Sequence, residues 1–229
     1  MELKINEVFY SIQGEGKNMN VPTVFVRFQG CNLHPGCRWC DTSKARGDGG
    51  DDVSIYEVMS CINTTLEHHT EPRVHHVCIT GGEPLVQHRD VMELVLKLKA
   101  QGIYVEVFTN GSLEPPVWRY QVDSWVADVK CPSSGVTSSE YEKWFGMRKQ
   151  DQVKFVVADN TDLEYVKSLN PYKYCRPEVV ISPMIPVGFG IVGLEQYTWA
   201  RKVVDFCKLY GYRFSLQQHK LLWGEKEGV

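Results

Sequence analysis

Short apolar runs rich in β-branched residues alternate along the chain with longer segments whose apolar positions recur at helical spacing. In residues 89–100, Val91, Leu94, Val95 and Leu98 fall on one helical face, and Gly102 follows as a stop signal. Strands alternating with helices are typical of a parallel sheet covered by helices. We predict an α/β fold, as a parallel barrel or an open sheet, with strands at residues 23–29, 74–79, 103–109, 124–130, 152–157, 178–182 and 213–216.

Helix starts are indicated by a hydroxyl followed three residues later by a carboxylate, because this pair can satisfy the free amides of a first turn. Such capping boxes occur at Ser54/Glu57, Thr137/Glu140 and Thr161/Glu164. No repeat, low-complexity tract or long linker divides the 229 residues, although residues 46–52 are rich in Gly and Asp and are expected to form a mobile loop. We therefore predict a single domain spanning residues 1–229.

Composition and charge narrow the class of function. The net charge is −3, and no lysine or arginine block forms the basic footprint of a nucleic-acid binder. No apolar run approaches the roughly 20 residues that span a bilayer, and the N-terminus lacks the pattern of a secretory signal. We expect a cytoplasmic protein that acts on a small molecule and has neither nucleic acid nor membrane as a partner.

Three of the eight cysteines, Cys31, Cys37 and Cys40, lie on one loop directly after a predicted strand. Clustered cysteines in a chain of this kind favour metal binding over disulfides. Three thiolates on a four-iron cubane leave one iron open to coordinate another molecule, which indicates chemistry rather than structural support. The alternative is a structural zinc ion completed by His34 or a more distant group.

The other cysteines and the paired histidines suggest no further metal site. The remaining cysteines are scattered over predicted helices, strands and loops, as small core residues often are: Cys61, Cys78, Cys131, Cys175 and Cys207. Neighbours on a strand point to opposite faces, so His75 and His76 cannot readily share an ion. Like His68 and His69, they are predicted to be solvated or packed.

Two further segments accompany the cysteine loop. Asp41-Thr42 follow it directly, and Thr80-Gly81-Gly82-Glu83-Pro84 ends the next predicted strand. Together with the cysteines they resemble the radical S-adenosylmethionine (SAM) superfamily. The resemblance implies a partial (β/α) barrel of about six parallel strands, with chemistry at their carboxyl ends. It also implies a [4Fe–4S] cluster whose open iron binds SAM, from which a 5′-deoxyadenosyl radical is released.

A narrower similarity runs almost from end to end. It includes Phe-Tyr-Ser-Ile-Gln-Gly-Glu-Gly at 9–16, Phe-Val-Arg at 25–27, Asp-Val-Lys-Cys-Pro-Ser-Ser-Gly at 128–135 and Gln-His-Lys at 218–220. These motifs resemble the 7-carboxy-7-deazaguanine synthase family. The resemblance implies a carbon–nitrogen lyase that converts 6-carboxy-5,6,7,8-tetrahydropterin to 7-carboxy-7-deazaguanine with loss of ammonia, on the way to queuosine and other 7-deazapurines. It further implies Mg²⁺, an external electron donor such as flavodoxin, and a homodimer.

The resemblance assigns roles to individual residues. The metal ligands would be Cys31, Cys37 and Cys40 for the cluster and Thr42 for Mg²⁺. The SAM contacts would be Trp39, Cys40, Asp41, Gly82, Thr109, Asn110, Lys130, Ser133, Ser134, Gly135 and Gln217, and the substrate contacts Ile12, Gln13, Gly14, Arg27 and Thr80. The guanidinium fork of Arg27 suits the substrate carboxylate, with a structural ion pair as the alternative. Glu83 is expected to brace its loop rather than transfer protons.

The chain departs from the family pattern at two points. Five residues separate Cys31 from Cys37, where the family has three, so the loop must bulge. Phe108 precedes Thr109-Asn110-Gly111 where the family often has Glu, so one SAM contact is expected to differ. Two rival functions remain: a radical SAM activase acting on a partner protein, which the motifs at 13–16 and 132–135 argue against, and a non-catalytic zinc-stabilised binding module.

Overall fold

The computed structural model describes residues 2–68, 75–137, 140–186, 194–224, 226 and 228. Its strands are β1 (Glu2–Ile12), β2 (Pro22–Phe28), β3 (Asp51–Ser54), β4 (His76–Gly81), β5 (Tyr104–Thr109), β6 (Ser124–Asp128), β7 (Gln152–Val157), β8 (Glu178–Pro183) and β9 (Arg213–Phe214). Its helices are α1 (Ile55–His68), α2 (His88–Ala100), α3 (Tyr141–Phe145), α4 (Asn160–Leu169), α5 (Pro171–Tyr174), α6 (Leu194–Tyr210) and α7 (Gln218–Trp223).

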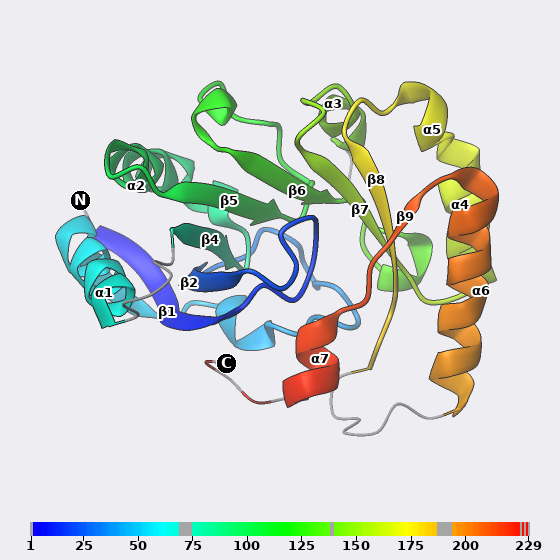
Figure 1. The fold of residues 1–229 in the computed structure, drawn as a ribbon, viewed down its shortest axis with the longest axis horizontal. Helices are drawn as coiled ribbons and strands as arrows, with labels where there is room; N and C mark the ends of the chain where they lie inside the picture. Colours follow the sequence, from blue (N-terminus) through cyan, green and yellow to red (C-terminus); the bar gives the residue numbers. More distant parts are fainter. Residues whose placement is uncertain are drawn as a thin grey trace.

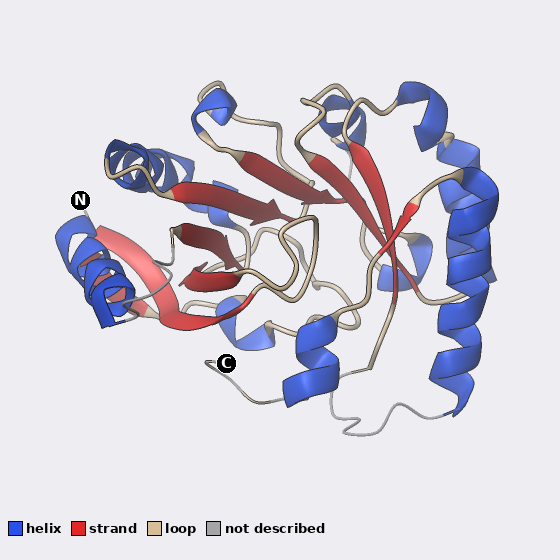
Figure 2. Cartoon of the chain, viewed as in Figure 1, coloured by secondary structure: helices blue, strands red, loops and turns tan. Residues whose placement is uncertain are grey.

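The nine described strands form one sheet in the order β3-β1-β2-β4-β5-β6-β7-β8-β9. Every neighbouring pair from β2 to β9 is parallel, whereas β1 pairs antiparallel with both β2 and β3. The sheet stays open, with β3 and β9 as its two edges, and the larger helices lie around its outside (Figures 1 and 2). The predicted α/β fold of the partial-barrel type is thus confirmed, with seven strands in its parallel run.

The core lies between the sheet and these outer helices. The α2 residues predicted to share one face, Val91, Leu94, Val95 and Leu98, are all fully buried. Farther along the sheet, Trp118, Trp125 and Trp144 form an aromatic chain with ring centroids 5.6 and 5.5 Å apart. No helix among the described residues combines the length and apolarity needed to cross a membrane.

Of the three predicted capping boxes, the one at Ser54 is confirmed. The Glu57 carboxylate accepts from the Ser54 amide at 2.7 Å, and the Ser54 hydroxyl accepts from the Glu57 amide at 3.3 Å. The box at Thr161 is wrong, because α4 starts earlier and Asp159 accepts the Asp162 amide. At Thr137 the following helix, α3, has Glu140 as its N-cap, with no side-chain cap, so that box is wrong too.

Candidate active site

A cavity of about 620 Å³ opens at the carboxyl ends of the parallel strands. Its walls come from the segments that follow β2, β4, β5 and β6, together with the end of β1 and the region around α7. In parallel sheets the carboxyl ends of neighbouring strands face the same side, so loops far apart in sequence meet there. The cavity is therefore the place where the sequence motifs converge.

All three predicted cluster cysteines line this cavity. The side-chain amide of Asn110 approaches the Cys31 sulfur at 3.8 Å, from the end of β5. Burial raises the pKa of the Cys37 thiol, and the charge of Lys130 partly offsets that rise. Within the described residues, no three His, Cys, Asp or Glu side chains are grouped as ligands of a single ion.

The loop that carries these cysteines, which is two residues longer than in the family, is held by hydrogen bonds to Arg46. The Arg46 guanidinium donates to the Pro35 carbonyl, and the Cys31 amide donates to the Arg46 carbonyl at 3.1 Å. His34 is exposed and does not line the cavity. A zinc site completed by His34, one of the alternatives drawn from the sequence, is therefore not the arrangement that this loop adopts.

The turn after β4 is packed so closely that it requires glycine. A β-carbon on Gly82 would lie 2.2 Å from the Gly30 carbonyl oxygen and 2.4 Å from that of Ala45. The same turn is held by Glu83, which is fully buried and accepts from the Thr109 hydroxyl at 2.8 Å and the Asn110 amide at 2.6 Å. Glu83 thus joins the ends of β4 and β5, in agreement with the bracing role predicted for it.

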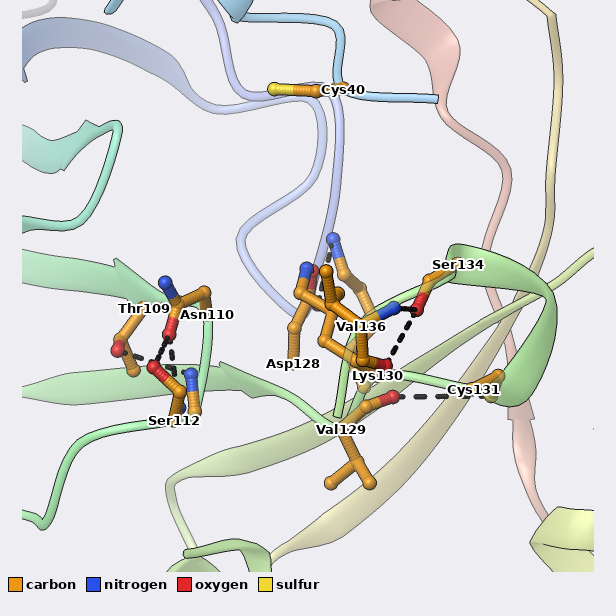
Figure 3. A network of polar contacts seen from close by, with 12 residues as sticks. Cys40, Thr109, Asn110, Ser112, Asp128, Val129, Lys130, Cys131, Ser134 and Val136 are labelled. Atoms are coloured by element: carbon orange, nitrogen blue, oxygen red, sulfur yellow. Dashed lines mark hydrogen bonds and ion pairs between the residues drawn. The ribbon is translucent and has the colours of Figure 1, made fainter. Parts of the chain in front are cut away.

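Most of the predicted SAM contacts surround the cysteines. Figure 3 shows Thr109 and Asn110 at the end of β5 and Lys130 and Ser134 in the segment after β6, with Cys40 set apart from both groups. The predicted SAM contacts that line the cavity are Trp39, Cys40, Asp41, Gly82, Thr109, Asn110, Lys130, Ser134 and Gln217. Two do not line it: the Ser133 hydroxyl donates to Asp162, and Gly135 packs against Arg38. Phe108, which stands where the family often has Glu, also lines the cavity.

The five predicted substrate residues also line the cavity: Ile12, Gln13, Gly14, Arg27 and Thr80. Arg27 donates from Nε to Glu7 at 2.7 Å, and its guanidinium lies 5.4 Å from the Phe9 ring centroid. The structural ion pair named as the alternative role of Arg27 is therefore present, on a side chain that faces the cavity. Glu7, Phe9 and Phe25 belong to this wall and were not predicted from the sequence.

Replacing Arg27 with lysine tests the substrate role of this residue. The charge remains, but lysine cannot offer two parallel hydrogen bonds, so we expect the KM for a carboxylate substrate to rise about tenfold. Glu7→Gln is the matched control, because it breaks the Arg27 ion pair while keeping the guanidinium. Equal losses of stability in both variants, with no change in KM, would contradict the assignment. Steady-state kinetics and thermal unfolding measure both quantities.

A chain of buried charges crosses the floor of the cavity. Lys154 lies 2.5 Å from the Glu15 carboxylate and 3.3 Å from that of Asp128, which in turn contacts Lys130 at 2.7 Å. Burial alone would lower the pKa of Lys154, but the charges of Asp128 and Glu15 hold it above its ordinary value. The same contacts hold the pKa of both carboxyls below their ordinary values, although burial opposes this.

Sequence reasoning missed Lys154 because its segment was read only as a core strand. The signal was available, since a lysine at an alternate position of the apolar run 152–157 resembles the placing of Arg27 in β2. A charged residue on the inner face of a buried strand needs partners, and the partners are supplied by other elements. Those partners, Glu15 and Asp128, are brought to it only by the fold.

The segment around α7 closes the opposite side of the cavity. His219 Nε2 lies 3.5 Å and Lys220 Nζ 3.4 Å from the Asp41 carboxylate. Although burial opposes it, these contacts hold the pKa of Asp41 well below its ordinary value. Lys220 also donates to the side-chain oxygen of Gln217 at 3.0 Å. Both residues therefore fasten the end of the chain to the cysteine loop.

The Thr42 hydroxyl also faces this cavity. It lies 3.8 Å from the Cys40 sulfur and 3.5 Å from the Gly81 carbonyl oxygen. A hydroxyl oxygen is a suitable ligand for a hard cation, and its neighbours are the cysteine loop and the end of β4. The position is consistent with the metal role that the resemblance implies for Thr42.

Comparison with known proteins agrees with this geometry. Residues 25–126 match the radical SAM superfamily. The fold is similar to the crystal structure of QueE from Escherichia coli, with a TM-score of 0.65 and 22% identity over 94% of each chain. It is also similar to SuiB from Streptococcus suis bound to S-adenosylmethionine, with a TM-score of 0.54 and 13% identity over 84% of this chain and 48% of that one.

Relatives with higher identity narrow the family. The 7-carboxy-7-deazaguanine synthase of Methanospirillum hungatei is 37% identical over 96% of this chain and 85% of its own length. The enzyme of the same name from Thermoplasma acidophilum is 32% identical over 98% of this chain and 99% of its own. Similarity at this level over nearly the whole of both sequences shows that the chain belongs to the 7-carboxy-7-deazaguanine synthase family of the radical SAM superfamily.

Proposed function

We propose that this chain converts 6-carboxy-5,6,7,8-tetrahydropterin to 7-carboxy-7-deazaguanine with loss of ammonia. The observation that carries the proposal is one cavity with the three cluster cysteines on one wall and Gln13, Gly14 and Arg27 on another. Two molecules can be held there with their reacting atoms close together, which replaces a diffusive encounter by an oriented step. The names of the family's relatives supply the reaction.

Membership of the superfamily implies a [4Fe–4S] cluster and SAM as cofactors. Cys31, Cys37 and Cys40 would hold the cluster, and their chemistry fits because thiolates are its usual ligands. When bound, the cluster and SAM together supply abstraction of a hydrogen atom from the substrate. The side chains near Lys130, Asn110 and Gln217 would orient SAM, and the enclosing walls would keep competing hydrogen donors away.

The proposal extends to the remaining components that the resemblance implies. The Thr42 hydroxyl would ligate Mg²⁺, with the substrate carboxylate and water completing the shell. Arg27 would face the same carboxylate. An external one-electron donor such as flavodoxin would reduce the cluster, and two copies of the chain would form a homodimer, which light scattering tests.

An anaerobic assay tests the reaction itself. Reconstituted protein with dithionite, SAM, Mg²⁺ and 6-carboxytetrahydropterin should yield 7-carboxy-7-deazaguanine by mass spectrometry, and omission of Mg²⁺ should reduce the rate. Formation of 5′-deoxyadenosine without the deazaguanine would keep the radical SAM chemistry but refute the substrate. Bound zinc without iron or sulfide would refute both.

A further inference from the structure

A buried polar cluster adjoins the cavity, and the reaction proposed above assigns a role to only one of its members, Gln13. It consists of Glu106 on β5, His76 and Cys78 on β4, and two residues of the segment between β1 and β2, Gln13 and Asn18. Glu106 is fully buried and accepts from the Gln13 side-chain amide at 2.7 Å and from that of Asn18 at 2.7 Å. Its carboxylate therefore fixes a residue that the proposed function assigns to the substrate.

The orientation of Gln13 follows from this contact. Its amide nitrogen donates to Glu106, and its amide oxygen accepts from the backbone amide of Glu15 at 3.3 Å. Gln13 is 3% exposed and lines the cavity. Glu106 Oε2 holds the amide nitrogen of Gln13 as an acceptor, so the carbonyl oxygen of Gln13 stays on the Glu15 side.

The hydrogen bonds around His76 locate its proton. The Thr23 hydroxyl lies 2.8 Å from the Val21 carbonyl oxygen and 2.6 Å from His76 Nδ1. A carbonyl has no hydrogen to give, so the single hydroxyl hydrogen of Thr23 goes to Val21. The other contact then requires Nδ1 of His76 to carry a proton and donate it to Thr23. In the neutral ring, this leaves Nε2 as a bare acceptor.

That bare nitrogen faces the carboxylate. His76 Nε2 is buried, has no hydrogen-bond partner among the described residues, and lies 3.8 Å from Glu106 Oε2. Two acceptors buried face to face repel each other unless a proton lies between them. We propose that Glu106 is a protonated, neutral carboxylic acid facing the bare Nε2 of a neutral His76, and that this neutral buried pair positions the Gln13 amide for the substrate; the second part rests on the proposed function.

The electrostatic surroundings favour the proton on Glu106. Burial raises the pKa of Glu106 to about 7, with the Asn18 and Gln13 hydrogen bonds opposing the rise, and burial lowers the pKa of His76 to about 4. Of the charged groups facing the pair, Lys17 favours ionised Glu106 and Glu15 opposes it, while Asp123 favours the charged form of His76. The buried thiol of Cys78, opposite Glu106 on β4, completes the surroundings.

The pair gives a distinctive dependence of stability on pH. Unfolded Glu and His titrate near 4.5 and 6.5. Because folding raises the pKa of Glu106, this residue makes the protein less stable as the pH rises from 4.5 through 7. Because folding lowers the pKa of His76, this residue makes the protein less stable as the pH falls from 6.5 through 4. In the wild type these opposite slopes cancel between pH 4.5 and 6.5.

Single variants should expose each slope. Relative to the wild type, Glu106→Gln should lose stability on going from pH 7 to pH 5, and His76→Gln should lose it from pH 5 to pH 8. Denaturant unfolding at each pH gives the comparison. A wild type and variants with the same pH dependence would overturn the neutral pair.

A second measurement is made on the wild-type protein and uses a variant only to assign one signal. In holoenzyme labelled with ¹⁵N-histidine, with the signal assigned by its loss in His76→Gln, we expect His76 to be neutral and protonated on Nδ1 at pH 5.5. An imidazolium, or a proton on Nε2, at that pH would overturn the neutral pair.

The positioning role is tested by kinetics. In Glu106→Gln, an amide nitrogen at the Oε2 position can donate to the bare Nε2 of His76 but also meets the Gln13 donor. Gln13 must then turn its oxygen away from Glu15, and we expect the KM for the pterin to rise about tenfold while the KM for SAM stays unchanged. Ser124→Ala is the matched control, because Ser124 is a buried β6 residue opposite Glu106 and its hydroxyl contacts Gln150 instead.

The kinetic outcomes separate the two proposals. An unchanged KM for the pterin in Glu106→Gln, in a protein that does turn the pterin over, would overturn the positioning role and leave the reaction intact. If the wild type does not convert the pterin at all, the proposed function and with it the positioning role fail, whereas the ¹⁵N spectrum still tests the neutral pair of Glu106 and His76.

Discussion

Replacing Cys37 with alanine should abolish both cluster assembly and turnover. Cys37 lies on the cavity wall with Cys31 and Cys40, and two thiolates cannot replace three in holding a cubane that already lacks a fourth protein ligand. After anaerobic reconstitution, the variant should contain little iron and sulfide and should lack the broad visible absorption of a [4Fe–4S] cluster. It should form neither 5′-deoxyadenosine nor the deazaguanine, while remaining folded.

Cys61→Ala provides the matched control. Cys61 is an exposed cysteine on α1, outside the cavity, so its loss removes a thiol without touching the proposed cluster site. This variant should keep wild-type iron content and rate. A Cys37→Ala protein that retained iron, sulfide and turnover would refute the ligand assignment, and an iron loss of equal size in both variants would point to a general effect of removing thiols.

Replacing Lys154 with methionine should cause the largest loss of stability outside the hydrophobic core. The side chain is buried 2.5 Å from Glu15 and 3.3 Å from Asp128. Methionine fills a similar volume but leaves these two carboxylates facing each other in a poorly hydrated place. Removing one partner of a buried ion pair typically destabilises a protein by about 3–5 kcal/mol, and we expect a loss of that order in the free energy of unfolding.

The pH dependence of the Lys154→Met variant follows from the same contacts. Without the lysine charge, burial and mutual repulsion should raise the pKa of Glu15 and Asp128, so the variant should recover stability as the pH is lowered towards 5. Turnover should fall as well, because Glu15 and Asp128 line the cavity.

Lys143→Ala is the control for charge removal in general. Lys143 pairs with Glu114 and Glu140 at an exposed position, where water screens the interaction, so its loss should leave stability nearly unchanged. Denaturant unfolding at several pH values compares the two variants. A Lys154→Met protein as stable as Lys143→Ala, or one that is destabilised equally at every pH, would contradict the role given to the buried charge chain.

Together, these variants examine different parts of one cavity and its surroundings by independent measurements. The Cys37→Ala variant is examined by its iron and sulfide content. The Lys154→Met variant tests the buried charges in the floor of the cavity, through the free energy of unfolding. Glu106, in the cluster that adjoins the cavity, reports on substrate affinity. A protein that assembles its cluster normally but has lost affinity for the pterin would separate the cofactor wall from the substrate wall.

Local patterns in the sequence were enough to predict the parallel strands and the motifs at their ends. Periodicity located the seven strands of the parallel run, because buried strands need continuous apolar runs and helices need a 3.6-residue repeat, and both are local properties. The Ser54 cap was predictable for the same reason, since it involves only residues three apart. The caps at Thr137 and Thr161 failed where neighbouring residues, Glu140 and Asp159, take the cap position.

Which distant side chains meet could be seen only in the folded chain. Lys154 finds Glu15, 139 positions away, and Glu106 finds Gln13, 93 positions away. The sequence gives no pattern for such pairs, because their proximity depends on how β1, β5 and β7 are placed in one sheet. A buried charge or amide must find a partner wherever the fold brings one, so these polar contacts follow from the packing of the whole chain and not from any local segment.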